Sequence, residues 1–90
     1  MPEPLLVEDA NEEWWSRSQE YRDAVNAWLA REGIDVMDLK RVEAYLVDTP
    51  FAHLWFHMRD DDGRVRWSEE DEKPLLRAET VLLSSLPPKF

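Results

Sequence analysis

The chain has 90 residues, of which 20 are acidic and 11 basic, and its formal net charge is −9 at pH 7. This length suits one small domain that folds around a single core. So acidic a chain argues against a general nucleic-acid binder, because binding to phosphates depends largely on Lys and Arg. The sequence contains no cysteine, which excludes disulfides and thiolate chemistry.

The sequence carries no signal for a membrane. No stretch approaches the roughly 20 apolar residues of a membrane-spanning helix. Residues 1–8 hold two prolines and a short apolar patch, and they lack the basic segment and apolar run of a signal peptide. We expect them to form an N-terminal arm that either packs in an extended conformation or stays loose. A cytoplasmic protein without membrane contact is the resulting expectation.

Residues 9–33 have the pattern of one long amphipathic helix. Asp9 and Glu12 have the spacing of a capping box, in which the aspartate side chain accepts a hydrogen bond from the backbone at Glu12. Gly33 suits the left-handed position that ends a helix, and Ile34 after it can close the end as in a Schellman motif. The predicted apolar stripe comprises Trp14, Ser18, Tyr21, Val25 and Trp28, widened by Trp15, Ala24 and Leu29.

Residues 39–84 predict an antiparallel sheet, because apolar and polar side chains alternate there with a period of two. The first strand ends near Asp48, since Pro50 has no N–H for a ladder, and a second strand follows over 51–59. A three-residue loop over 49–51 keeps the apolar side chains on one face, whereas a two-residue loop would mix the faces. The expected pairs are Leu46 with Leu54, Ala44 with Phe56 and Val42 with Met58.

A second hairpin is predicted at Asp62 and Gly63, because glycine accepts a positive φ without strain. It brings residues 64–67 back as a third strand. Residues 80–83 are β-prone and can add a fourth strand. The hairpin sets Met58 opposite Trp67 and Asp60 opposite Val65, and the predicted core face comprises Val42, Ala44, Leu46, Leu54, Phe56, Met58, Val65 and Trp67.

Together these elements predict an α+β fold in a single domain over residues 1–90. One long N-terminal helix packs on an antiparallel sheet of three or four strands, in the order αββββ. The parts are the arm (1–8), the helix (9–33), the sheet (39–84) and a C-terminal tail (85–90), which can continue neither regular structure.

No reaction signature appears in the sequence. His53 and His57 lie four residues apart, which on a strand separates them by about 13 Å at roughly 3.3 Å per residue, too far to share a metal ion. The two glycines are Gly33 and Gly63, so no glycine-rich phosphate loop exists. No serine has the context of an activated nucleophile. We therefore expect neither an enzyme nor a cofactor or metal.

The second face of the predicted sheet is the candidate binding site. The predicted register sets Tyr45 opposite Trp55 and Glu43 opposite His57, with Arg41 near Arg59. Trp, Tyr and Arg are enriched at protein interfaces, so this face predicts a protein partner or self-association. In the alternative interpretation, the N-terminal arm or the tail covers the two aromatic side chains. The candidate partner-binding residues are Tyr45, Trp55, His53, His57, Arg59, Glu43 and Arg66.

Two other interpretations involve nucleic acids. An acidic protein can mimic DNA and inhibit a DNA-binding host protein, although here the acidic residues are interspersed with Arg. Aromatic side chains interleaved with Arg on a sheet can also stack single-stranded bases. The net charge weighs against direct binding of nucleic acid, which we do not expect.

Several turn and strand motifs resemble those of a group of known proteins. They are Trp28-Leu29, Gly33–Asp35, Arg41–Tyr45, Asp48 with Pro50–Ala52, Asp61–Arg64 and Val81–Pro87. In these motifs, over roughly the last two thirds of the chain, the sequence resembles small proteins encoded by actinobacteria and their bacteriophages. The resemblance implies a phage or prophage accessory protein, and it carries over no activity and no functional residues.

Overall fold

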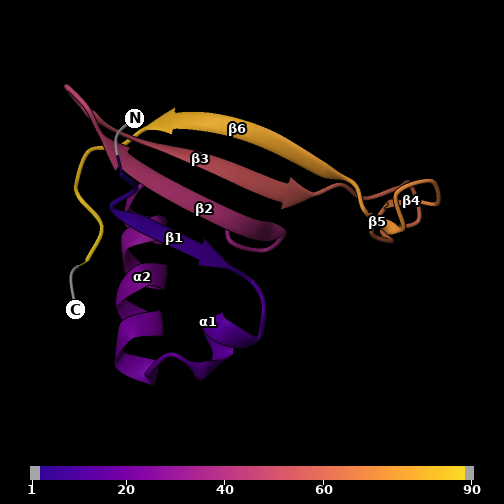
Figure 1. Ribbon diagram of the computed structural model, residues 1–90, viewed down its shortest axis with the longest axis horizontal. Coiled ribbons are helices and arrows are strands. Elements are labelled where there is room, and N and C mark those ends of the chain that lie inside the picture. Colours follow the sequence, from indigo (N-terminus) through magenta and orange to yellow (C-terminus); the bar gives the residue numbers. More distant parts are fainter. Residues whose placement is uncertain (1–2, 89–90) are drawn as a thin grey trace.

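The computed structural model describes residues 3–88, which form two helices and six strands. A four-stranded antiparallel sheet has the order β1-β2-β3-β6, and both helices lie on one side of it (Figure 1). The predicted α+β class is therefore confirmed. The elements are β1 (Leu6–Asp9), α1 (Glu12–Ser16), α2 (Gln19–Arg31), β2 (Leu39–Leu46), β3 (Pro50–His57), β4 (Trp67–Ser68), β5 (Lys73–Pro74) and β6 (Leu76–Leu82).

The single long helix predicted over 9–33 is wrong, because the chain leaves helical geometry at Arg17 and Ser18. Serine side chains compete with the helical backbone, and the Ser18 hydroxyl caps α2 by accepting a hydrogen bond from the Tyr21 N–H at 3.1 Å. The break also lets Arg17 form an ion pair with buried Glu8 on β1, at 3.2 Å. Tyr21 donates its hydroxyl to the same carboxylate at 3.0 Å. The interruption thereby attaches both helices to β1.

The predicted start of the helical region is wrong, whereas its predicted end is confirmed. The cap of α1 is Asn11 and not Asp9, because Asp9 belongs to β1 and pairs there with Arg41. The predicted end at Gly33 is confirmed: its φ is +75°, and its N–H and that of Ile34 each donate to carbonyls of the last turn at 3.0 Å. Neither helix within residues 3–88 is long and apolar enough to cross a membrane.

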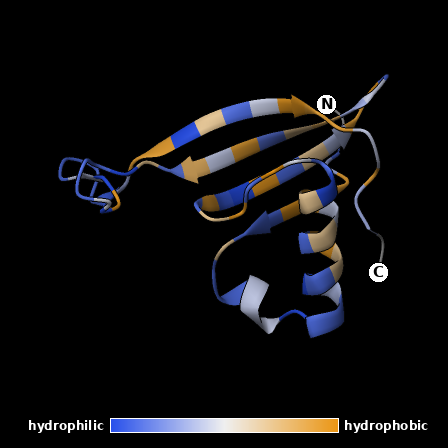
Figure 2. Cartoon of the chain, turned by 180° about the vertical axis from the view of Figure 1, so that it is seen from behind, coloured by the Kyte–Doolittle hydropathy of each residue, from blue (hydrophilic) through white to orange (hydrophobic). Residues whose placement is uncertain are grey.

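The first hairpin forms as predicted but in another register. Leu46 pairs with Pro50, so the three-residue loop covers 47–49 instead of 49–51. Pro50 is tolerated as the first residue of its strand, where its carbonyl accepts from the Leu83 N–H at 2.9 Å. The shift is an even number of residues, which keeps each side chain on its predicted face, and Figure 2 shows the resulting alternation along the strands. Leu46 pairs with Pro50 and not Leu54, Ala44 with Ala52 and not Phe56, and Val42 with Leu54 and not Met58.

The predicted fourth strand over 80–83 is confirmed as part of β6, but the strands that flank the central hairpin differ from the prediction. Residues 64–67 do not join the four-stranded sheet, and β6 pairs with β3 instead, over seven residue pairs. The N-terminal arm is in part a strand, since Leu6–Asp9 forms the opposite edge beside β2. Pairing with β6 gives β3 far more ladder bonds than the short segment 64–67, which makes only one isolated bridge to Arg59.

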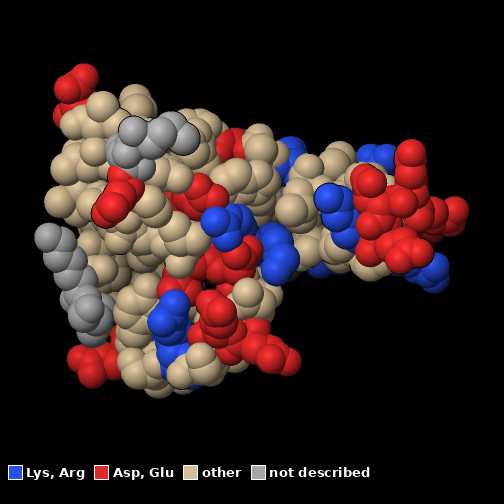
Figure 3. Space-filling model, viewed as in Figure 1, with Lys and Arg blue, Asp and Glu red and all other residues tan. Residues whose placement is uncertain are grey.

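Residues 58–75 form an extension that projects beyond the end of the sheet (Figure 1). Its first turn is held by the Asp60 carboxylate, which accepts from the N–H groups of Asp62 and Arg64 at 2.9 and 3.0 Å. The short strands β4 and β5 pair with each other farther out. Acidic side chains gather at the tip of the extension (Figure 3); its exposed acidic residues are Asp60, Asp61, Asp62, Glu69, Glu70, Asp71 and Glu72.

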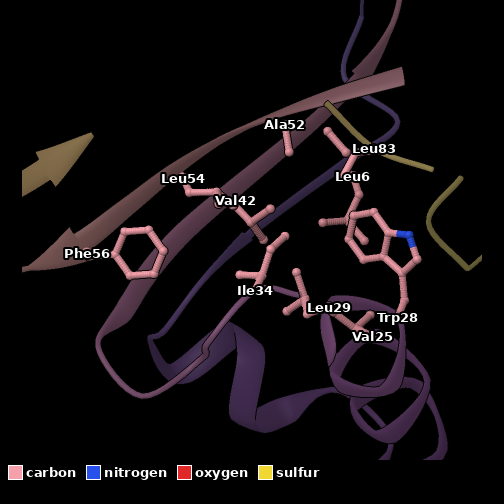
Figure 4. Packing of buried hydrophobic residues seen from close by; sticks show 11 residues of the cluster. Leu6, Val25, Trp28, Leu29, Ile34, Val42, Ala52, Leu54, Phe56 and Leu83 are labelled. Carbon is pink, nitrogen blue, oxygen red and sulfur yellow. The ribbon is translucent and has the colours of Figure 1, made fainter. Parts of the chain in front are cut away.

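The hydrophobic core lies between α2 and the inner face of the sheet (Figure 4). Trp28 is fully buried at its centre, and its indole N–H donates to the Ser85 carbonyl at 3.3 Å. Four predicted core residues are buried, namely Val42, Ala44, Leu54 and Phe56. Met58 is half-buried, whereas Leu46, at the β2–β3 turn, and Val65 and Trp67, in the extension, are exposed.

Candidate protein-docking face

The candidate site is the face of the sheet that points away from the helices. Ala52, Leu54 and Phe56 of β3 are buried against the helical layer, so the intervening side chains of β3 point to the other side. On β2, Tyr45 pairs with Phe51, the first outward residue of β3. No helix of the described chain lies on this side (Figure 1). We call Tyr45, Phe51, His53 and Trp55 the aromatic face.

The four rings form one continuous cluster. Tyr45 and Phe51 are stacked, with centroids 5.5 Å apart and ring planes at 17°. The His53 ring lies at the centre, with its centroid 5.7 Å from Tyr45, 5.4 Å from Phe51 and 6.2 Å from Trp55. The two contacts of Tyr45 join β2 to β3 and stabilise the strand pairing, and all the ring contacts together fix the ring positions.

A chain of charged groups borders the cluster. Arg41 forms ion pairs with both Asp9 and Glu43, and its guanidinium carbon lies 5.8 Å from the centroid of the Trp55 ring. The Tyr45 hydroxyl donates to the Glu43 carboxylate at 2.6 Å. This hydrogen bond and that from Arg41 lower the pKa of Glu43, while the same contact with Glu43 raises the pKa of Tyr45. The carboxylate therefore stays charged, and Arg41 is already neutralised within the face.

Apolar side chains extend the aromatic face toward both edges of the sheet. Leu5 and Val7, at β1, are 44% and 36% exposed, and Leu82 on β6 is 80% exposed. Between them, His53 Nδ1 lies 2.8 Å from the Thr80 hydroxyl, which joins β3 to β6 across the face. An apolar row thus crosses the outward side of the sheet from Leu5 over Tyr45 and Phe51 to Leu82, and the charged side chains of Arg41 and Glu43 lie beside it.

Within residues 3–88, neither terminal segment covers this surface. The segment Leu6–Asp9 lies in the plane of the sheet as β1 and pairs with β2. On the other side of the molecule, Ser84 and Ser85 lie against the end of α2, where both donate to the Glu32 carboxylate. The alternative in which the arm or the tail covers Tyr45 and Trp55 does not hold for the described residues.

The structure brings only some of the predicted site residues together. Tyr45, Glu43, His53 and Trp55 lie side by side, and His57 lies farther along the same face at the end of β3. Arg59 and Arg66 belong to the extension and lie away from the cluster, where Arg59 pairs with Asp38 at 2.8 Å. Each of the three predicted cross-strand neighbours is replaced by the residue four positions earlier. Tyr45 pairs with Phe51 and not Trp55, Glu43 with His53 and not His57, and Arg41 with Trp55 and not Arg59.

Phe51 is the main residue of the site that the sequence prediction missed. The proline before it placed it in the predicted loop. Its odd position in the alternating run nevertheless matches His53 and Trp55, and this parity was the signal for its outward direction. The contributions of Leu5, Val7 and Leu82 had no such signal, because they depend on which strands flank the hairpin.

The described residues hold no group of three or more His, Cys, Asp or Glu side chains that could bind a metal ion. Comparison of the chain with protein-family models, with curated proteins and with solved structures gave no match. The fold and the site together define a small α+β domain with an aromatic sheet surface that the two helices leave uncovered.

Proposed function

We propose that the chain is a small non-catalytic protein-interaction module that docks another protein chain on the aromatic face. The observation that carries the proposal is the side of β3 that α2 does not cover, where the large aromatic residues Phe51 and Trp55 alternate with His53 and His57. A strand side that faces water normally carries polar residues, whereas large aromatic side chains grouped on it are typical of a surface that another protein covers. A docked protein would supply the second layer.

The electrostatics of the face fit a protein better than a nucleic acid. Arg41 is held by Asp9 and Glu43, so it offers no free charge to a phosphate. A protein surface with apolar side chains can cover the rings without having to neutralise a charge. Because ring contacts and ion pairs already fix the side chains, docking would order few of them, which favours affinity.

The setting is also a proposal. The resemblance of the turn and strand motifs to small actinobacterial and phage proteins supports a phage or prophage accessory protein. We place such a protein in the bacterial cytoplasm, where its partner would be a host or phage protein or a second copy of the chain.

Photo-crosslinking tests the docking proposal. A photoreactive phenylalanine analogue at His53, in the centre of the aromatic face, is compared in producing cells with the same probe at Ala27, exposed on α2. We expect a discrete adduct from position 53 and none from position 27. The mass of the adduct distinguishes a second copy from another protein. Absence of an adduct from position 53, or equal labelling from both positions, would contradict the proposal.

The extension supports a second candidate, inhibition of a DNA-binding protein by mimicry of DNA. Its exposed carboxylates gather at one end of the molecule and could replace phosphates in a basic cleft (Figure 3). A quadruple variant, with Glu69, Glu70 and Glu72 changed to Gln and Asp71 to Asn, separates the two functions. It would abolish the mimic activity but leave crosslinking from position 53 unchanged.

A further inference from the structure

The outer edge of β6 is an unpaired strand edge. Within residues 3–88 no strand pairs with β6 on the side away from β3 (Figure 1). Hydrogen bonds run from Met58 N–H to the Leu75 carbonyl at 3.1 Å and from Leu83 N–H to the Pro50 carbonyl at 2.9 Å. Hydrogen-bonded pairs alternate in antiparallel ladders, so the odd-numbered residues of β6 bond to β3. The residues that direct N–H and C=O groups to the open edge are Leu76, Ala78, Thr80 and Leu82.

This edge lacks most of the features that normally prevent strand pairing. Natural edge strands are short, or carry lysine, proline or a bulge. β6 pairs with β3 over seven residues in unbroken register and contains no Lys, Pro or Gly. The opposite edge, β1, has only four residues. The remaining protection on β6 is a pair of charges on its helix-facing side, Arg77 and Glu79, which would deter an apolar strand.

We propose that β6 pairs with β6 of a second copy of the chain, antiparallel about a two-fold axis at Ala78. This register sets Arg77 opposite Glu79 of the second copy, and Glu79 opposite its Arg77. A two-fold axis at Arg77 or at Glu79 would place like charges opposite each other. An axis at Thr80 would place Glu79 opposite Val81. Only the axis at Ala78 compensates both charges, so the same pair that deters other strands selects a second β6.

The side chains are already arranged for this contact. The Arg77 guanidinium lies 2.9 Å from the Glu79 carboxylate, with its central carbon 4.8 Å from the centroid of the Phe56 ring. In the proposed register these two residues occupy non-hydrogen-bonded positions, where opposite side chains come closest. Two arginines and two glutamates then alternate around the axis. The backbone of Leu76 forms hydrogen bonds with that of Thr80 of the second copy, and the backbone of Ala78 forms them with that of Ala78 of the second copy.

The contact joins two four-stranded sheets into one continuous sheet. The two-fold axis is perpendicular to the sheet, so both aromatic faces lie on the same side and remain open. The inference does not depend on the proposed docking function, because Arg77 and Glu79 point to the helical side. A dimer formed through β6 would present two docking faces next to each other.

Charge reversal tests the proposed pairing by solution mass. By light scattering, we expect the wild type to have twice the chain mass of 10.7 kDa. The variants Arg77→Glu and Glu79→Arg should each have the mass of one chain, and circular dichroism should show that both are folded. An equimolar mixture of the two variants should regain the double mass, because each copy then carries the charge that the other requires. The double reversal in one chain should also remain dimeric. A monomeric wild type, dimeric single variants, or a mixture that stays monomeric would overturn the proposal.

A single cysteine tests the register, since the chain has none of its own. Residues in a hydrogen-bonded antiparallel pair have Cα atoms about 5.5 Å apart, within the range of disulfides. Ala78→Cys on the axis should therefore crosslink the dimer on oxidation, at least ten-fold faster than Thr80→Cys, whose position faces Leu76 of the second copy. Equal rates, or faster linkage through position 80, would contradict an axis at Ala78.

Discussion

At the scale of single residues, Glu32 makes the connection that closes the fold. Its carboxylate accepts hydrogen bonds from the N–H and hydroxyl groups of both Ser84 and Ser85, at 2.7 to 3.0 Å. These donors, first the Ser84 N–H and then the Ser85 hydroxyl, lower the pKa of Glu32 from 4.5 to about 2. The sequence could not predict this contact, because Glu32 resembles any surface acid and its partners lie more than 50 residues away.

Glu32 predicts a specific loss of stability in acid. A carboxyl group whose pKa is lowered by folding stabilises the protein fully above its ordinary pKa of 4.5, and this contribution is lost as the pH falls toward about 2. We expect Glu32→Gln to be less stable than the wild type at pH 7, and the difference to disappear between pH 4.5 and 2. Urea unfolding across this range measures it, with Glu20→Gln on the surface of α2 as the control. A difference independent of pH would contradict the role of the charge.

At the scale of elements, the sequence predicts the face of the sheet on which a side chain lies better than the residue with which it pairs on the next strand. Alternation assigned Val42, Ala44 and Leu54 to the core and Tyr45 and Trp55 to the outside, and the structure agrees. It could not fix the register, because a shift by an even number of residues leaves every side chain on the same face. The helix break had a local signal in Ser18, but the continuous apolar stripe concealed it.

The end of α2 gives a prediction at this scale. Gly33 has a φ of +75°, and a Cβ added there would meet nothing within 4 Å, so the cost of substitution is backbone strain alone. Gly33→Val should lower the free energy of unfolding by about 1 to 2 kcal/mol, the penalty of an L-residue in this conformation. Gly33→Asn should cost less, since asparagine tolerates it. Denaturant unfolding measures both; equal stabilities of the two variants and the wild type would contradict the assignment.

At the scale of the whole molecule, long-range pairing decided what the sequence left open. The central hairpin was predictable from local pattern, whereas its flanking strands come from the two ends of the chain. Segment 64–67 has the correct alternation for a strand, but β6 offers a longer partner to β3. This choice leaves residues 58–75 as a charged extension and gives the aromatic face its apolar margin at Leu82.

The layered arrangement implies that the aromatic face contributes little to folding, which leaves it free for the proposed docking. The core packs on one side of the sheet only, and the rings on the other side remain half-buried within the single chain. Tyr45→Thr/Trp55→Thr keeps residues of high β-propensity. We therefore expect the double variant to stay folded and to lose no more than about 2 kcal/mol, compared with about 3 to 5 kcal/mol for truncation of a buried aromatic side chain.

The most direct measurement is the yield of the crosslinked adduct from position 53 in this folded double variant. We expect a yield at least ten-fold lower than in the wild type, because the partner loses the rings that it covers. Arg77→Glu, which changes only the edge of β6, is the matched control and should leave the yield unchanged unless the adduct is with a second copy held through β6. An undiminished adduct from the folded double variant would contradict the account, since a partner would then bind without the aromatic face.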